Sequence, residues 1–343
     1  MTTTTLSLAD WPARGRELFP GVLACAVAAT AATFLSQHYG APVMLFALLL
    51  GIAMNFLSEG QCAPGVAFSA RTVLRWGVAL LGLRITGGEI AALGWQPVLG
   101  VVASVALTMG ISIVAARLMG FRTAFGVLSG GATAICGASA AMALAAAMPP
   151  HPQRDKALSF TIIGVSALST IAMVVYPLIA RAAGLDPAQA GIFLGGSIHD
   201  VAQVVGAGYS MSTPIGDTAT VVKLLRVAML LPVIALTVVL MRGPGITDQA
   251  GAQAPAQRPA LLPWFVTVFA VLVAINSLGW IPKPVAQAGS ALSSWLLVLS
   301  MAAIGVKTQI KELASVGLRP IVLMVGETVL LAVIVLVLVR LYG

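Results

Sequence analysis

The residues best suited to chemistry form a polar cluster inside an otherwise apolar stretch of the chain. They are Ser197, His199, Asp200 and Gln203. Charged groups at the depth of a bilayer are costly, so they normally face a wet cavity or a polar partner. Histidine titrates near neutral pH. We therefore predict that His199 and Asp200 carry a coupling proton, and that Ser197 and Gln203, on the helix face of Asp200, contact a substrate. A structural alternative is that His199 bonds a backbone carbonyl and Asp200 pairs with an arginine. If Asp200 is structural, Glu327, an acid within the last apolar run, is the next candidate for the coupling proton.

Paired glycines precede polar residues in two apolar stretches. Glycine is a poor helix former, so we expect each helix to open at its glycine pair. Non-helical backbone at membrane depth is tolerated where it lines a cavity, and the half-helix that follows offers unpaired N–H groups to an anion. The predicted anion-binding residues are Gly130, Gly131, Thr133, Ser139, Gly195, Gly196, Ser197 and Gln203. The alternative is close packing of small residues between helices.

Two segments far apart in the chain share one pattern. Gly82, Glu89, Ala91, Gly94 and Pro97 recur as Gly305, Glu312, Ala314, Gly317 and Pro320. Arg84 is matched by Lys307, so we predict that both cations approach a central anion path. The copies fall in the third and tenth predicted spans, which gives them opposite orientations, as in the inverted repeats of alternating-access carriers. Arg75, Lys223 and Arg226, in or near span ends, are expected to extend to the membrane interface.

The elements that position these residues are predicted to be membrane-spanning helices. Of the 343 residues, 59% are hydrophobic and 9% charged, too few charges for a soluble surface. A bilayer core needs about 20 apolar residues per helix, which predicts eleven spans. They run near residues 18–35, 41–57, 72–90, 97–118, 124–148, 157–180, 188–208, 219–241, 261–280, 293–307 and 320–341. The predicted fold is a single all-α transmembrane domain with halves at about 18–181 and 188–341 and a polar linker over 242–260.

The net charge of +8 is interpreted as a topology signal rather than a nucleic-acid footprint, because basic residues stand at the ends of apolar runs. The N-terminal side receives Arg14, Arg16, Arg71, Arg117, Arg122, Arg181, Arg242, Arg258, Lys307, Lys311 and Arg319. The other side receives Arg154, Lys156, Lys223, Lys283 and Arg340. Because cytoplasmic loops carry the excess of basic residues, we predict a bacterial inner-membrane protein with a cytoplasmic N-terminus and a periplasmic C-terminus.

These features favour a secondary active transporter of a small anion rather than an enzyme. No GxxxxGK[ST] motif is present, so a proton or sodium gradient is the expected driver. Cys25, Cys62 and Cys136 form no CxxC, and neither a disulfide, a metal nor a cofactor is expected. One alternative is an intramembrane enzyme that uses Cys136, His199 and Asp200, and another is a passive anion channel. The expected partners are a small inorganic or organic anion, the coupling ion and the lipid bilayer, with a homo-oligomer left open.

Four segments together resemble one bacterial family. They are GGATAICGASAAMAL within residues 128–144, GGSIHDVAQVVGAG over 195–208, KLLRVAML over 223–230 and LRWGVALLGLRI over 74–85. They are similar to the conserved inner-membrane proteins named as a sulfate exporter family, which is grouped with the cation/proton antiporters and anion transporters. The resemblance implies inverted repeats, two broken helices that cross at the membrane centre, and export of sulfate, sulfite or a sulfonate. The two glycine-pair spans are the fifth and seventh, however, and simple inversion accommodates them only if the repeats are permuted or one segment does not span.

Overall fold

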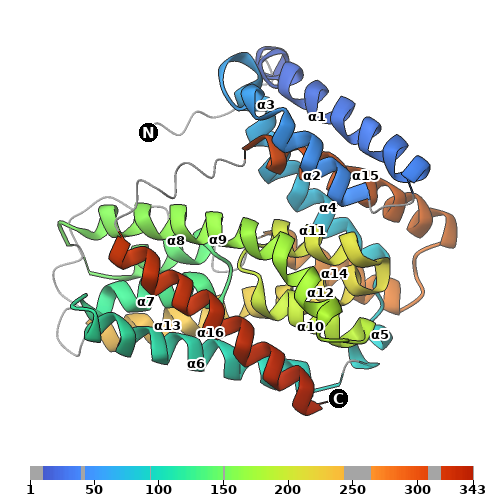
Figure 1. Cartoon of the computed structure of the whole chain (residues 1–343). Coiled ribbons are helices and arrows are strands. Elements are labelled where there is room, and N and C mark those ends of the chain that lie inside the picture. Colours follow the sequence, from blue (N-terminus) through green and yellow to red (C-terminus); the bar gives the residue numbers. More distant parts are fainter. Residues whose placement is uncertain are drawn as a thin grey trace. The chain divides into compact units, whose positions relative to one another are not determined.

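The part of the chain that the structure describes is built from helices (Figure 1). The computed structural model describes residues 11–39, 43–92, 94–149, 151–242, 264–307 and 318–342. Seven helices in these ranges are long and apolar enough to cross a bilayer: Gly15–Tyr39, Gly60–Leu83, Gln96–Leu118, Lys156–Ala182, Thr213–Val239, Lys283–Lys307 and Leu318–Leu341. Three shorter apolar helices are Val43–Ala53, Ala138–Ala147 and Trp264–Ser277. The chain is an all-α polytopic membrane protein, as its composition predicts. Most of the predicted linker and of the second repeat segment falls outside the described residues.

The chain divides into two compact units. Unit 1 comprises Met1–Thr86 and Val268–Gln309, and unit 2 comprises Gly87–Thr267 and Ile310–Gly343. The α-helices of unit 1 are α1 (Trp11–Tyr39), α2 (Val43–Ala53), α3 (Ala63–Phe68), α4 (Leu74–Leu80), most of α14 (Trp264–Ser277) and α15 (Lys283–Lys307). Short turns of other helix types lie at η2 (Asn55–Ser58), η3 (Gly60–Cys62), η4 (Ser69–Val73) and η5 (Leu81–Leu83). Each unit thus takes residues from both ends of the chain. The two predicted sequence halves stay a prediction.

Close helix crossings in unit 1 depend on glycine. A Cβ atom built on Gly21 of α1 would lie 2.1 Å from the carbonyl oxygen of Cys62. One built on Gly51 of α2 would lie 2.2 Å from the carbonyl oxygen of Ala302 in α15. No side chain fits at these distances, so the backbones can approach this closely only because glycine occupies both positions.

The repeated segments make reciprocal contacts in unit 1. A Cβ on Gly82 would lie 2.5 Å from a carbonyl oxygen of α14, and a Cβ on Gly305 would lie 2.4 Å from a carbonyl oxygen of α2. Asn276 of α14 donates to the carbonyl of Ile85 at 3.3 Å, and Asn55, just after α2, donates to the residue after Gly305 at 2.6 Å. The first copy therefore meets α14 as the second meets α2. A two-fold relation between repeats requires this pattern.

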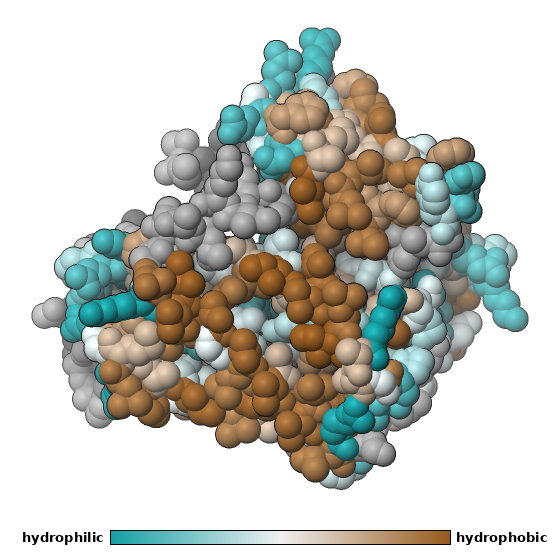
Figure 2. All heavy atoms as spheres, viewed as in Figure 1, coloured by the Kyte–Doolittle hydropathy of each residue, from teal (hydrophilic) through white to brown (hydrophobic). Residues whose placement is uncertain are grey.

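Unit 2 contains the glycine-pair segments. Its helices are α5 (Gly87–Ala92), α6 (Gln96–Leu118), α7 (Thr123–Ala134), α8 (Ala138–Ala147), α9 (Arg154–Ala182), α10 (Pro187–Ser197), α11 (Val201–Met211), α12 (Thr213–Ala228), α13 (Leu230–Arg242) and α16 (Leu318–Tyr342). Apolar side chains cover much of the face shown in Figure 2. On α16 a stripe of exposed valines recurs every four residues, at Val325, Val329, Val333 and Val337. A stripe of exposed valines on a helix with few polar residues is suited to contact with lipid tails.

The first glycine-pair segment folds as a helical hairpin. On one continuous helix, Gly131 and Leu144 would be about 20 Å apart. A Cβ built on Gly131 would instead lie 2.3 Å from a side-chain methyl carbon of Leu144. The chain therefore reverses at residues 135–137, and α8 returns alongside α7. We name α7, these three residues and α8 hairpin 1.

The second glycine-pair segment is also a hairpin. Gly191 of α10 and Gly208 of α11 lie on opposite sides of the break at residues 198–200, yet both pack on the same turns of α12. A Cβ on Gly191 would lie 2.5 Å from Cβ of Thr218, and one on Gly208 would lie 3.2 Å from Cβ of Ala219. We name α10, residues 198–200 and α11 hairpin 2.

The two hairpins enter from opposite ends of α9 and α16. Hairpin 1 precedes the start of α9, and its mouth shares a cavity with Pro320 in the first turn of α16. Hairpin 2 follows the end of α9, and Gly196 packs on Val335 near the far end of α16. Arg340, close to that end, donates to the carbonyl of Ala183. Two of the eleven predicted apolar segments, the fifth and the seventh, are therefore hairpins that fold back on themselves instead of single continuous helices. With α9 between them, the hairpins are mutually inverted, which removes the conflict between the glycine pairs and the inverted repeat.

Candidate functional site

The tips of the two hairpins meet inside unit 2. Tip 1 is residues 135–137 and tip 2 is residues 198–200. Gly137 has φ +67°, a backbone conformation that favours glycine, and a Cβ built there would lie 3.8 Å from Cβ of His199. The prediction that each helix opens at its glycine pair is wrong in position, because α7 and α10 continue through their glycine pairs and end four residues after Gly130 and two residues after Gly195. Intrinsic propensity was overridden by packing.

The glycine pairs instead allow close helix packing. A Cβ on Gly130 would lie 2.5 Å from Cβ of Ser112 in α6, and Gly131 faces Leu144 of α8. Gly195 faces the backbone of Ala219 in α12 at 2.4 Å, while Gly196 faces α16. Their predicted part in anion binding stays a prediction, whereas their packing role is visible in the structure.

Lys223 of α12 holds the two tips together. Its side chain is fully buried, and its ammonium donates to the carbonyl oxygens of Ile135 at 2.7 Å, Ile198 at 3.0 Å and His199. An ammonium has three hydrogens, so each can serve one carbonyl. Two of these carbonyls belong to tip 2 and one to tip 1. The prediction that this lysine extends to the interface is therefore wrong, because backbone dipoles replace water around its charge.

Arg226, one turn further along α12, completes the same arrangement. It is fully buried and donates to the carbonyls of Thr133 at 2.9 Å and of Ala134 at 2.6 and 2.9 Å, at the end of α7. It also reaches Gly195 at 3.3 Å and Ile198 at 3.0 Å, at the end of α10. The C-terminal ends of helices carry partial negative charge and leave carbonyls unpaired. Two cations from one face of α12 therefore neutralise both half-helix ends.

The second half-helices begin differently at the two tips. Asp200 caps α11: its carboxylate accepts from the amide of Ala202 at 3.1 Å, and its own amide donates to Ser169 at 3.1 Å. α8 begins at Ala138, and its N-cap residue, Gly137, has no side chain that could cap the helix. Ser139, in the first turn of α8, is exposed. Of the two N-termini, only that of α8 is left without a carboxylate cap.

The other predicted residues of hairpin 2 are buried. Ser197 donates back to the carbonyl of Phe193 at 2.5 Å within α10. His199 contacts Thr328 of α16 through Nε2 at 2.9 Å, and its Nδ1 has no hydrogen-bond partner among the described residues. The side-chain oxygen of Gln203 likewise has none. The structure thus brings all four members of the predicted cluster to tip 2 and its two flanking half-helices, and it leaves two polar atoms there without a protein partner.

A buried carboxyl cluster lies beside tip 1. Glu327 of α16 contacts Ser112 of α6 and, from α7, Ser129 at 2.7 Å and Thr133 at 3.2 Å. Thr133 was predicted from its sequence context, but Ser112 and Ser129 were not. Glu327 itself carried a signal, an acid in the middle of an apolar run. Its partners lie 194–215 residues away in sequence, so only the fold could reveal them.

Arg84 and Lys307 belong to unit 1. Arg84 is half-buried after η5, and Lys307 is exposed at the end of α15. The other ten predicted residues lie in unit 2 and group around the hairpins. The prediction that Arg84 and Lys307 approach an anion path stays a prediction.

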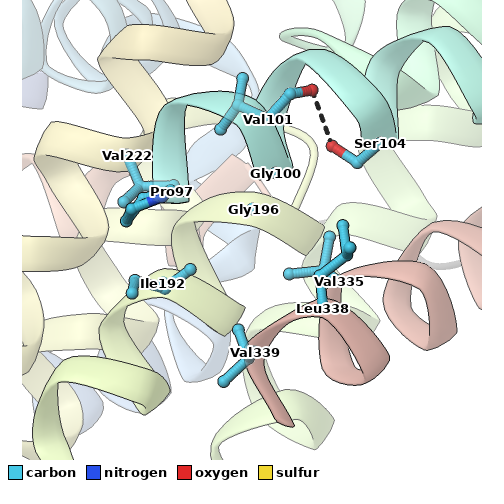
Figure 3. A pocket seen from close by; sticks show the side chains of 10 residues that line it. All are labelled: Pro97, Gly100, Val101, Ser104, Ile192, Gly196, Val222, Val335, Leu338 and Val339. Atoms are coloured by element: carbon cyan, nitrogen blue, oxygen red, sulfur yellow. Dashed lines mark hydrogen bonds between the residues drawn. The ribbon is translucent and has the colours of Figure 1, made fainter. Parts of the chain in front are cut away.

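A small cavity near hairpin 2 is a packing void (Figure 3). It measures about 20 Å³ and lies among α6, α10, α12 and α16. Ser104, the hydroxyl residue on its wall, donates to the carbonyl of Val101 at 2.9 Å within its own helix, as Figure 3 shows. Since a buried water needs two or more polar partners, this void suits neither water nor a polar substrate.

Comparisons with known proteins agree with the motifs. The sequence profile described as "Conserved hypothetical protein 698" matches residues 20–324. The chain is 51% identical over 328 residues to "UPF0324 membrane protein TauZ" of Paracoccus denitrificans, covering 94% of this chain and 96% of the relative. It is 52% identical over 320 residues to "UPF0324 membrane protein CT0845" of Chlorobaculum tepidum, covering 93% and 88%. No solved structure matches. The chain therefore belongs to the UPF0324 family, a family of conserved bacterial membrane proteins.

Proposed function

We propose that the protein is a secondary active transporter that exports a small anion, such as sulfate, sulfite or a sulfonate, across the bacterial inner membrane. The observation that carries this proposal is the meeting of two oppositely inserted hairpin tips at Lys223. Each hairpin opens toward a different end of unit 2, so either can give access to the same central place. Alternating-access carriers place discontinuous helices at such a place.

An anion is the substrate class that the charges favour. Lys223 and Arg226 neutralise the negative ends of α7 and α10, while the positive end of α8 has no carboxylate cap. The exposed hydroxyl of Ser139 stands in the first turn of that helix. Helix N-termini bind anions through unpaired amides and the helix dipole.

A carrier is favoured over the two alternatives. Neither ring nitrogen of His199 bonds Cys136, since Nε2 contacts Thr328 and Nδ1 has no partner in the described chain. This argues against a Cys–His nucleophile pair. A passive channel needs a continuous path, whereas the two cations and both tips close the centre of unit 2. We propose a proton or sodium gradient as the driver, because the sequence has no ATP-binding motif.

The orientation that we propose keeps the N-terminus in the cytoplasm. Because hairpin 1 returns to the end of unit 2 from which it starts, Arg154 and Lys156 lie at the same end as Arg117 and Arg122. Arg181, at the other end of α9, lies at the opposite end of unit 2. Relative to the eleven-span prediction, two basic residues join the N-terminal side and one leaves it. The excess of basic residues on the N-terminal side is therefore larger than when all eleven segments are counted as crossings. This excess favours that side as the cytoplasmic face.

Uptake into proteoliposomes tests the proposal. Labelled sulfate, sulfite and small sulfonates are offered under an imposed pH gradient and, separately, a sodium gradient, and at least one should accumulate with saturation. Ser139→Asp places a carboxylate at the start of α8, where it should repel the substrate and lower uptake by about tenfold or more. Ala188→Asp, an exposed first-turn position of α10, is the matched control and should leave uptake unchanged.

Three results would count against this proposal. If none of these anions accumulates under either gradient, small-anion transport is excluded for the purified protein. If Ser139→Asp transports like wild type, the anion does not bind at the start of α8. Uptake that never saturates would favour a channel.

A further inference from the structure

A carboxyl side chain is buried among hydroxyl groups in unit 2. Glu327 is 3% exposed. Its hydrogen-bond partners among the described residues are neutral hydroxyls: Ser112 of α6, and Ser129 and Thr133 of α7. Ser112, Ser129 and Thr133 are themselves fully buried. We name these four residues the Glu327 cluster.

No cationic side chain pairs with Glu327 in the described part of the chain. The helices packed against α16 are α6, α7, α9 and α10. Tyr176 of α9 and His199 of tip 2 contact Thr328, the residue after Glu327. Arg226 donates to the backbone carbonyl of Thr133 and not to Glu327 in any contact of the described residues. The other charged residues of α6, α9 and α16 stand in first or last turns: Arg117, Arg154, Asp155, Lys156, Arg181, Arg319 and Arg340. α7 and α10 contain none. An ionised Glu327 would therefore be a buried charge without a counter-charge, which is strongly unfavourable.

The hydrogen atoms available to the cluster also favour a protonated carboxyl. Besides Glu327, Ser112 contacts the carbonyl of Gly126 at 2.9 Å, and Ser129 contacts the carbonyl of Phe125 at 3.0 Å. With the three contacts to Glu327, this makes five oxygen–oxygen contacts. Each contact needs one hydrogen atom to be a hydrogen bond. The three hydroxyls supply one hydrogen each, and an ionised carboxylate supplies none because it only accepts. A proton on Glu327 raises the supply to four, since the acid can donate to a serine that then donates to its carbonyl.

The cluster lies next to an open cavity. A cavity of about 590 Å³ at the mouth of hairpin 1 is lined in part by Phe125 and Leu128, which precede Ser129 on α7 by four residues and by one residue. Its wall also carries basic residues and the start of α16: Arg122, His151, Arg154, Lys156 and Pro320. Leu128 is the chain neighbour of Ser129, which places the cavity wall one residue from the cluster along α7.

Thr133 connects the cluster to the hairpin tips. Its hydroxyl contacts Glu327 at 3.2 Å, and its backbone carbonyl accepts from Arg226 at 2.9 Å. A displacement of hairpin 1 that opens tip 1 must therefore also remove a hydroxyl from Glu327. Binding of a substrate at the tip and binding of a proton at Glu327 are then coupled reciprocally.

We propose that Glu327 is the proton-carrying residue of the transporter and that the coupling ion is a proton. The proton passes from cavity water to a carboxylate oxygen of Glu327 and returns to water in the alternate state, with no other bond made or broken. This inference rests on the proposed transport function and replaces the expectation that Asp200 carries the proton, since that carboxylate caps α11. Sodium is disfavoured because the cluster oxygens touch one another at hydrogen-bond distances, which leaves no space for an ion between them.

Two measurements on Glu327→Gln test this inference. Glutamine keeps the size and hydrogen bonding of a protonated glutamate but cannot ionise. At one proton per substrate, each unit of pH gradient supports about tenfold accumulation. We expect the variant to lose this accumulation and to keep gradient-free exchange of substrate for substrate. Asp217→Asn, which alters a carboxyl bonded by Tyr209 at 2.6 Å outside both sites, should keep the gradient response.

The second measurement does not depend on transport. The infrared carbonyl band of a protonated carboxylic acid, recorded on purified wild-type protein near neutral pH, should be absent from Glu327→Gln and unaffected by sodium. If the band is unchanged in Glu327→Gln or disappears on sodium addition, the proton site is refuted even if transport is found. If the band behaves as expected but no anion is transported, the proposed function fails while the proton site stands. A gradient response lost in Asp200→Asn but kept in Glu327→Gln would also overturn the inference.

Discussion

At the scale of single residues, the two cations of α12 show how backbone carbonyls stabilise buried positive charge in this protein. Lys223 and Arg226 bind backbone carbonyls at the ends of α7 and α10. Charge-assisted hydrogen bonds to carbonyls are stronger than neutral ones, and helix ends add the field of their dipoles. The same contacts satisfy carbonyls that would otherwise lie unpaired in a medium without water.

Replacing Lys223 by Met should destabilise the protein markedly. The change leaves three buried carbonyls without their donor, and each unsatisfied group costs about 1–3 kcal/mol. We expect a clear fall in the melting temperature in detergent and a lower folded yield. Lys156→Met is the matched control, because that lysine is exposed and its ammonium lies 5.5 Å from the Phe160 ring centroid. Its stability should change by about 0.5 kcal/mol or less. Equal melting temperatures for the two variants would contradict a structural role for Lys223.

Some of these residues could be found from the sequence and others could not. His199 and Asp200 were identifiable because polar residues in an apolar run are rare and costly. Lys223 and Arg226 stand near the end of an apolar run, where basic side chains usually extend to the interface, so their burial was missed. No feature of the local sequence distinguishes a basic residue that stays buried from one that extends to the interface. The partners of Lys223 are backbone carbonyls 24 to 88 residues away, which have no signature in residue types.

At the scale of elements, composition predicted which segments lie in the membrane but not their path. Hairpin 1 joins helices of 12 and 10 residues, which together are as long and apolar as one span. A length rule cannot distinguish them. The sharp turn depends on Gly137 and on the packing of Gly131 against Leu144. The turn conformation is a backbone property and the packing contact is tertiary, so hydropathy carries no trace of either.

Cysteine labelling tests the hairpins directly. In a background without Cys25, Cys62 and Cys136, single cysteines replace residues at the two hairpin mouths: Arg122, Gln153, Ala188 and Thr213. We expect a membrane-impermeant thiol reagent to reach the first two from one side of the membrane and the last two from the other. Accessibility of positions 122 and 153 from opposite sides would instead mean that α7 and α8 together span the bilayer.

At the scale of the whole molecule, the basic residues set the expected orientation. An odd number of crossings remains when the two hairpins are counted as returning, so the chain ends should lie on opposite sides. The cavity at the mouth of hairpin 1, with Arg122, Arg154 and Lys156, would then face the cytoplasm. A basic cavity on that side would concentrate anions at the entrance from which export begins.

A C-terminal reporter checks the orientation. A fluorescent protein that matures only in the cytoplasm should stay dark when fused after the last residue. The same reporter fused to a chain truncated after Arg242 should be bright, because α13 returns to the N-terminal side. If the full-length fusion is bright, the number of crossings is even or the protein is inserted the other way.

The two cations of α12 also constrain how the protein is made. Synthesis proceeds from the N-terminus, so both hairpins are synthesised before residue 223 exists. Until α12 arrives, the carbonyls at their tips have no donor and are unfavourable in lipid. We therefore expect the hairpins to remain at the insertion machinery, where water can reach their tips, until α12 enters the membrane. A nascent chain halted before Lys223 should accordingly be an early target for membrane proteolysis, whereas one that extends past Arg226 should survive.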